Sequence, residues 1–148
     1  MSPKQTSLLF QVPTYGVSRS ELRDFAGQLA REVAGGRPFD CLITTDRELR
    51  RLNLEFRNQN RATDVLSFPA AGGNSFLGDI AISYDRAKRQ AGDYGLSVQQ
   101  EIQILMLHGV LHLLGMDHES DRGRMARAEA KWRATLGLPT ALIERARV

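Results

Sequence analysis

The chain has a single cysteine, Cys41, among its 148 residues, which excludes an internal disulfide bond. Disulfides are common in secreted domains and rare in the reducing cytoplasm. Residues 1–6 also lack the basic and then apolar pattern of a secretory signal peptide. We therefore expect a cytoplasmic protein, in which Cys41 serves as a small buried hydrophobic residue of a strand.

Long hydrophobic runs are also missing. The longest run, residues 104–116, is interrupted by two histidines and is shorter than the about 20 residues that a bilayer requires. We find no internal repeat, low-complexity tract or linker that would divide the chain. A chain of this length can enclose one hydrophobic core. We therefore expect one domain over residues 1–148, with no membrane contact.

Histidine is scarce, and its placement is the most informative feature of the sequence. The three histidines are His108, His112 and His118. The first two are four residues apart, so a helix would project them from one face, and Gly115 would let the chain turn back and bring His118 to the same point. Three imidazoles that meet in this way leave the fourth position of a tetrahedral zinc ion open, as in catalytic sites. We predict that they bind one zinc ion per chain.

An alternative is that these histidines belong to the hydrophobic core. A lone histidine on an apolar helix is more often a core residue that is bonded to a backbone carbonyl. Residues 102–114 are apolar almost all round, so the two imidazoles within them are expected to be buried. Burying an imidazole without a partner costs about 1–3 kcal/mol. A metal ion that accepts a lone pair from each ring removes this cost, which favours the metal site.

The residue after the first histidine is not the one found in metalloproteases. Metzincin proteases share the ligand spacing but carry Glu directly after the first histidine, as the general base. Here that residue is Gly109, which cannot accept a proton, so peptide hydrolysis by this route is disfavoured. Either the base comes from elsewhere or the metal lowers the pKa of its own water. Asp117 is the nearest carboxylate in sequence. It either orients a ligand histidine or caps the loop after the helix.

The excess of positive charge is small, at +3, with a sequence pI of about 9.4. It favours an anionic partner such as a nucleic acid, although many soluble proteins share it. Arginines cluster over residues 47–61, and a second basic group covers residues 86–89. These clusters are either RNA-binding surfaces or two solvated helix faces, since Glu48 and Glu55 partly offset the first one.

The hydrophobic periodicity predicts both strands and helices. Capping-box patterns at residues 18–21, 45–48 and 97–100 each begin a helix. A shorter helix is expected near residues 86–94, and a last one from about Ser120 to Leu136. Strands are expected at residues 7–12, 39–44, 63–69 and 76–84, with an antiparallel hairpin between the last two. This order predicts an α+β domain with a mixed four-stranded sheet, about five helices and a metal site at the end of a buried helix.

Four segments of the chain together carry the order and spacing of a known set of motifs. They are Leu-Asn-Leu-Glu-Phe-Arg at 52–57, Thr-Asp-Val-Leu-Ser-Phe-Pro at 63–69, Leu-Gly-Asp-Ile-Ala-Ile-Ser at 77–83, and the histidine run with Gly109 and Asp117. These segments resemble the YbeY family of bacterial metalloproteins, and the predicted elements around them fit its fold. The sequence departs from the family at Ala62, where proline is common, and in a short hairpin connection without acidic residues.

The resemblance implies a function in ribosomal RNA processing. The family looks like single-strand-specific endoribonucleases that mature the 3′ end of 16S rRNA and take part in ribosome quality control. Single-stranded rRNA, and the small ribosomal subunit or its assembly factors, would then be the partners. Carried over by motif, His108, His112 and His118 would be the zinc ligands, and Arg57 would be the family's functional arginine near the metal.

Alternatives to this function stay open at this point. A guanidinium such as that of Arg57 can hold two phosphate oxygens at once, but Arg57 could also be a surface helix residue paired with Asn53 or Glu55. The protein could be a zinc-stabilised ribosome-assembly or RNA-binding factor with little catalysis of its own. It could also be another metal-dependent hydrolase, of which the peptidase form is disfavoured by Gly109.

Overall fold

The computed structural model describes residues 5–71, 75–117 and 121–139. In this part of the chain the strands are β1 (Ser7–Phe10), β2 (Phe39–Thr44), β3 (Val65–Pro69) and β4 (Gly78–Ser83). The helices are α1 (Arg19–Glu32), α2 (Asp46–Arg57), α3 (Tyr84–Tyr94), α4 (Val98–Leu113) and α5 (Arg124–Leu136). Each predicted strand and helix is present, and their order along the chain is the predicted one.

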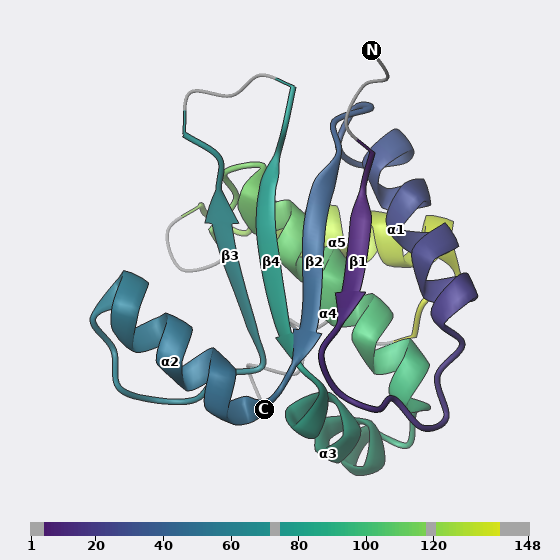
Figure 1. The fold of residues 1–148 in the computed structure, drawn as a ribbon. Helices are drawn as coiled ribbons and strands as arrows, with labels where there is room; N and C mark the ends of the chain where they lie inside the picture. The colour runs from purple at the N-terminus through teal and green to yellow at the C-terminus, as the bar shows by residue number, and fades with distance from the viewer. Residues whose placement is uncertain (1–4, 72–74, 118–120, 140–148) are drawn as a thin grey trace.

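The four strands form one mixed sheet in the order β1-β2-β4-β3 (Figure 1). β1, β2 and β4 are parallel to one another, whereas β3 runs antiparallel to β4 at the edge. The pairing of Ser67 with Ile80 lies in the middle of the β3–β4 register. This arrangement confirms the α+β class, the mixed four-stranded sheet and the predicted antiparallel hairpin.

Helices cover the two faces of the sheet unequally. α1 and α4 lie on one face, with α5 packed behind α4, while α2 lies over the other face beside β3 (Figure 1). The side chains of β2 alternate accordingly. Phe39, Cys41 and Ile43 are buried in the main hydrophobic core, whereas Asp40 and Leu42 are only half-buried. We call the first side the covered face and the second the open face.

α4 crosses the covered face as a buried helix. Ser97 begins it with a capping box, in which the N–H of Gln100 donates to the Ser97 hydroxyl and the N–H of Ser97 donates to Gln100 Oε1. The helix ends at Leu113, and Gly115 follows with a φ of 90°, which glycine adopts without strain. The predicted helix and the turn after it are thus confirmed. None of the described helices is long and apolar enough to cross a membrane.

Some predicted boundaries are wrong. α5 begins at Arg124 rather than near Ser120, because Arg122 and Gly123 have φ values of 58° and 83°, which no right-handed helix accommodates. β1 ends at Phe10 rather than at residue 12, and β3 begins at Val65 rather than at residue 63. The predicted capping box at Ser18 forms only in part, since its hydroxyl accepts from the helix but its own N–H donates to a glutamine of α4.

Candidate functional site

Two of the three histidines meet on the last turns of α4. The Nε2 atoms of His108 and His112 are 3.1 Å apart, and the ring planes cross at 72°. His108 is only 7% exposed, while His112 is half-buried. The helical spacing of four residues therefore brings the two rings together, as the sequence predicts.

The separation of these nitrogen atoms suits a shared metal ion. Two imidazole nitrogens bound to one tetrahedral zinc, each at about 2.0–2.1 Å, lie about 3.3 Å apart. The observed distance of 3.1 Å is close to this value. Residues 5–71, 75–117 and 121–139 contain no group of three or more His, Cys, Asp or Glu side chains placed to hold a metal. The third predicted ligand, His118, lies outside those residues, so the complete ligand set stays a prediction.

A buried carboxylate from another helix contacts His108, and sequence reasoning missed it. Glu129 of α5 is 1% exposed, and its Oε1 lies 2.7 Å from His108 Nδ1. The sequence carries one weak signal for this residue. Glu129 follows Met125 by four residues, on the stripe of α5 that faces the core, where a carboxylate is out of place unless it has a partner.

Arg57 ends α2 at the margin of the sheet. Its Nη2 donates to the carbonyl oxygen of Ser67 at 2.7 Å, and its guanidinium lies 5.6 Å from the centre of the Phe68 ring. The alternative pairings predicted for Arg57 are wrong, because Asn53 donates to a backbone carbonyl at 3.0 Å and Glu55 pairs with Arg51. One hydrogen bond and one ring contact with β3 thus hold the guanidinium beside the histidine helix rather than along its own helix.

Ser67 and Gly109 join β3 to α4 between these groups. The hydroxyl of Ser67 is buried and donates to the carbonyl oxygen of Gly109 at 3.0 Å. A Cβ added at Gly109 would lie 3.0 Å from Ile80 Cγ2 and 3.2 Å from Ser67 Oγ. The glycine therefore permits the close approach of helix and strand. A glutamate at this position, as in metalloproteases, would require the side chains of Ile80 and Ser67 to move.

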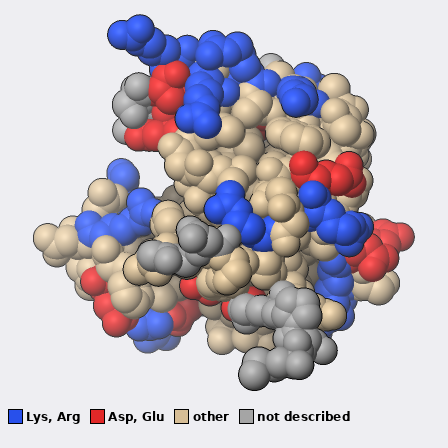
Figure 2. Space-filling view, turned by 90° about the horizontal axis from the view of Figure 1, so that it is seen from above, with Lys and Arg blue, Asp and Glu red and all other residues tan. Residues whose placement is uncertain are grey.

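One cavity of about 590 Å³ brings these residues together. Its lining comes from α2, the segment after it, β3 and the end of α4, and it includes Arg57, Arg61, Asp64, His108, His112 and Asp117. Seen from above, the surface is hollowed beside α2, with Lys and Arg on both sides of the hollow (Figure 2). Asp117 is placed at the cavity, and its two predicted roles both stay open.

The charge around the cavity is only partly neutralised by neighbours. Within the first arginine cluster, Arg51 forms ion pairs with Glu48 and Glu55, as the solvated-face alternative predicts. In the second basic group, Arg86 pairs with Asp46 at 2.8 Å. The two arginines of the first cluster that line the cavity bind other groups, since Arg57 binds a backbone carbonyl and Arg61 binds the side chain of Gln59. They place positive charge on the α2 side of the cavity, which Asp64 and Asp117 also line.

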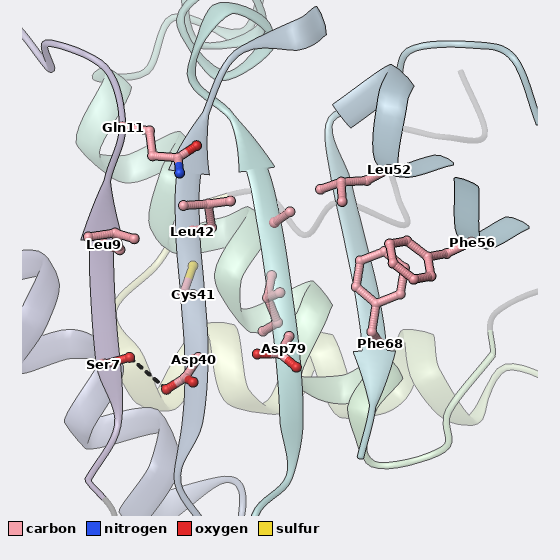
Figure 3. Close-up of a pocket in the computed structure, with 12 residues that line it drawn as sticks. Ser7, Leu9, Gln11, Asp40, Cys41, Leu42, Leu52, Phe56, Phe68 and Asp79 are labelled. Carbon is pink, nitrogen blue, oxygen red and sulfur yellow. Dashed lines mark hydrogen bonds between the residues drawn. The ribbon is translucent and has the colours of Figure 1, made fainter. Parts of the chain in front are cut away.

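A second hollow, of about 530 Å³, lies on the open face (Figure 3). Its floor includes a row of register neighbours, Phe68, Asp79, Asp40 and Ser7, in which Ser7 donates to Asp40 at 2.6 Å. Phe56 of α2 meets Phe68 edge to face at one end, with ring centres 5.6 Å apart. This hollow contains none of the predicted site residues.

The family model and the relatives that match this chain carry the same description. The family model described as "Endoribonuclease YbeY" matches residues 17–137. A relative named "Endoribonuclease YbeY" from Solibacter usitatus is 58% identical over 144 residues, which cover 97% of each chain. Another of that name, from Koribacter versatilis, is 50% identical over 131 residues and covers 88% of this chain and 85% of the relative.

A solved structure has the same fold. The solution structure of TM1509 from Thermotoga maritima matches with a TM-score of 0.56 and 21% sequence identity. The match covers 88% of this chain and 93% of that one. At this identity the likeness concerns the arrangement of strands and helices alone.

Proposed function

The chain belongs to the YbeY family of endoribonucleases, and from this premise we propose that it is a zinc-dependent, single-strand-specific endoribonuclease. Its substrate in this proposal is ribosomal RNA, with the 3′ end of 16S rRNA as the processing site and ribosome quality control as a second role. The small ribosomal subunit or its assembly factors are the partners, and the cytoplasm is the location.

One observation carries the proposal: the cavity combines a pair of converging imidazoles with a positioned guanidinium. His108 and His112 direct their Nε2 atoms to within 3.1 Å of each other, and Arg57 lines the same cavity. Cleavage of a phosphodiester is aided by a Lewis acid at the phosphate oxygens and by positive charge where negative charge develops. These residues provide places for both.

The residues that would hold the metal are His108, His112 and His118. Neutral imidazoles are good ligands for zinc, and three of them leave a position open for substrate. Bound there, zinc supplies Lewis acidity to the phosphodiester. The chain itself supplies the fixed ring positions and a cavity wall made by β3 and α4.

Arg57 is proposed to bind the scissile phosphate. Its Nη2 donates a hydrogen bond to the carbonyl oxygen of Ser67, and among the described residues neither Nε nor Nη1 donates one. Those two nitrogens are therefore the donors left for phosphate oxygens, and the bond to β3 limits the movement of the guanidinium. Arg57 is a catalytic residue in this proposal because it touches the reacting group.

Burial of His108 supports a preference for single strands. His108 is 7% exposed and lies in the wall of the cavity rather than on a flat surface. The backbone of an A-form duplex is held on the outside of a wide cylinder, whereas a single strand can bend and splay its bases. A phosphate that reaches this cavity is therefore easier to supply from a single strand.

A cleavage assay tests the proposal. Wild-type protein and His112→Ala, both with their zinc content measured, are incubated with a single-stranded precursor of the 16S rRNA 3′ end and with the same RNA as a duplex. We expect the wild type to cut only the single strand and the variant to cut neither. Equal cutting by both proteins would identify a contaminating nuclease and would contradict the proposal.

A zinc-stabilised assembly factor is the second candidate. The observation that favours it is the burial of His108, whose ring meets Glu129 of α5, because a metal bound to a buried ring would also stabilise the packing around it. If stoichiometric zinc is bound, neither RNA is cut, and zinc removal unfolds the protein, this alternative replaces the nuclease. RNA binding would then survive Arg57→Ala.

A further inference from the structure

Glu129 is a buried carboxylate that the cavity does not use directly. It lies in the second turn of α5, is 1% exposed, and is not among the residues that line the cavity. Its Oε1 is 2.7 Å from Nδ1 of His108, a residue of another helix that is 21 positions earlier. A charge is rarely buried so deeply without a function or a strong partner.

The contact fixes the chemistry of the ring that Glu129 meets. An ionised carboxylate can only accept a hydrogen bond, so a bond to ionised Glu129 requires the ring proton on Nδ1 of His108. The lone pair is then on Nε2, which is the atom that lies 3.1 Å from His112 Nε2. The bond therefore points the donor atom of His108 toward its neighbour and holds the ring plane there.

We propose that Glu129 is the positioning residue of the metal site. Its carboxylate selects the Nδ1–H form of His108, holds the ring in place and makes Nε2 a stronger ligand. This proposal rests on the proposed zinc-dependent function and deepens it. Carboxylates that bond the far nitrogen of a ligand histidine raise its basicity, and their loss lowers metal affinity by about 10–100-fold.

A purely structural role for Glu129 predicts something different. If the side chain only fills space and satisfies a polar group between α4 and α5, Glu129→Gln should keep the metal affinity. Glutamine has the same shape, and its Oε1 still accepts a hydrogen bond. The positioning role also depends on negative charge, so Gln should preserve the ring proton position but weaken the hold on the metal. Glu129→Ala should lose both.

Two measurements on the full-length protein separate these roles. The first is zinc affinity, determined by competition with a chromophoric chelator. We expect it to fall about 10-fold in Glu129→Gln and about 100-fold in Glu129→Ala. The second is NMR of the ¹⁵N-labelled imidazoles in the metal-free protein, which reports the proton position on His108. Glu55→Gln is the matched control, because Glu55 is exposed and pairs with Arg51, and we expect no change in it.

The results that would overturn the proposal are specific. If the zinc affinity of Glu129→Gln is within threefold of the wild type, the negative charge of Glu129 does not strengthen metal binding. If Glu129→Ala does not fold, this result alone decides between the two roles. A proton that stays on Nδ1 of His108 in a folded Glu129→Ala would remove the positioning role. Zinc affinity that depends on Glu129 without RNA cleavage would overturn the nuclease function alone. RNA cleavage with Glu129-independent zinc affinity would overturn this inference alone.

Discussion

Both faces of the sheet contribute residues to one cavity, but the elements on one face are buried and those on the other are exposed. On the covered face, α4 is buried almost throughout and presents a buried His108 and a half-buried His112. On the open face, α2 is largely exposed, and Phe56 and Leu9 remain 62% and 59% exposed around the hollow of Figure 3. β3 lies where the two faces meet. Its Ser67 accepts from Arg57 on one side and donates to α4 on the other.

This difference separates two kinds of constraint on the site. Groups on the covered face are fixed by close packing, which transmits any change in volume to the fold. The guanidinium on the open face is held by one hydrogen bond and one ring contact. Substitutions on the covered face should therefore alter stability, whereas substitutions of the arginine should alter activity alone.

Arg57→Ala is expected to have the largest effect on activity and the smallest on stability. Removal of one fixed donor to a developing charge typically lowers kcat by about 100–1,000-fold. Arg57 is exposed, so the melting temperature should stay close to that of the wild type. The measurement is cleavage of single-stranded RNA under saturating substrate, together with thermal unfolding.

Arg50→Ala provides the control for that comparison. Arg50 lies on the same helix, is exposed, and bonds to Asn60 at 2.8 Å, but it does not line the cavity. Its substitution should leave kcat within a few-fold of the wild type. Equal losses in the two variants would show that α2 acts only as a general basic surface, and would remove Arg57 from the catalytic group.

Gly109→Ala tests the tight packing of the covered face. The new methyl group would lie 3.0 Å from Ile80 Cγ2, and overpacking of this kind costs about 1–3 kcal/mol. Gly92→Ala, in α3, is the matched control because nothing lies within 4 Å of its added Cβ. Both variants gain about 1 kcal/mol of helix propensity, so that term cancels between them.

The expected result is a difference of about 1–3 kcal/mol in the free energy of unfolding, with Gly92→Ala the more stable variant. Urea denaturation of both variants and the wild type measures it. If Gly109→Ala were as stable as Gly92→Ala, α4 could move away from β3 and β4 at no cost. The fixed distance between the arginine and the histidines would then have no basis in packing.

Ser67→Ala should have a smaller effect, of about 0.5–1.5 kcal/mol, from the loss of one buried hydrogen bond. Arg57 binds the backbone carbonyl of Ser67, which the substitution keeps. Cleavage activity should therefore stay within a few-fold of the wild type while urea denaturation shows the lost stability. A loss of activity as large as that of Arg57→Ala, without lost stability, would show that the hydroxyl itself touches the RNA.

The same contrast between faces explains what could be predicted from the sequence. On α4, histidines stand out because every neighbour is apolar, so the helix and its converging histidine pair follow from the pattern. Arg57 lies among other arginines on an exposed helix, and only its motif distinguished it. Glu129 was missed because its partner lies on another helix, and spacing within one helix carries no information about contacts between two. The start of α5 was misplaced because Arg122, a non-glycine residue with a positive φ, gives no sequence signal of that conformation.

The last prediction compares thiols on the two faces of the sheet. We expect the substitution that introduces the second thiol to leave RNA cleavage unchanged. Cys41 is 2% exposed, and burial, followed by the negative charge of Asp40, raises the pKa of its thiol. Because the pKa is raised, the thiol stays protonated at pH 8 and should not react with a disulfide reagent such as DTNB, since the thiolate is the nucleophile. A thiol placed by Leu9→Cys, on the exposed side of β1, should have a pKa of about 8.5 and react quickly. We therefore expect one fast thiol in that variant, none in the native wild type, and reaction of Cys41 only in denaturant. Rapid labelling of native Cys41 would show that β2 opens to solvent, and that the covered face is less tightly packed than the contrast between the two faces requires.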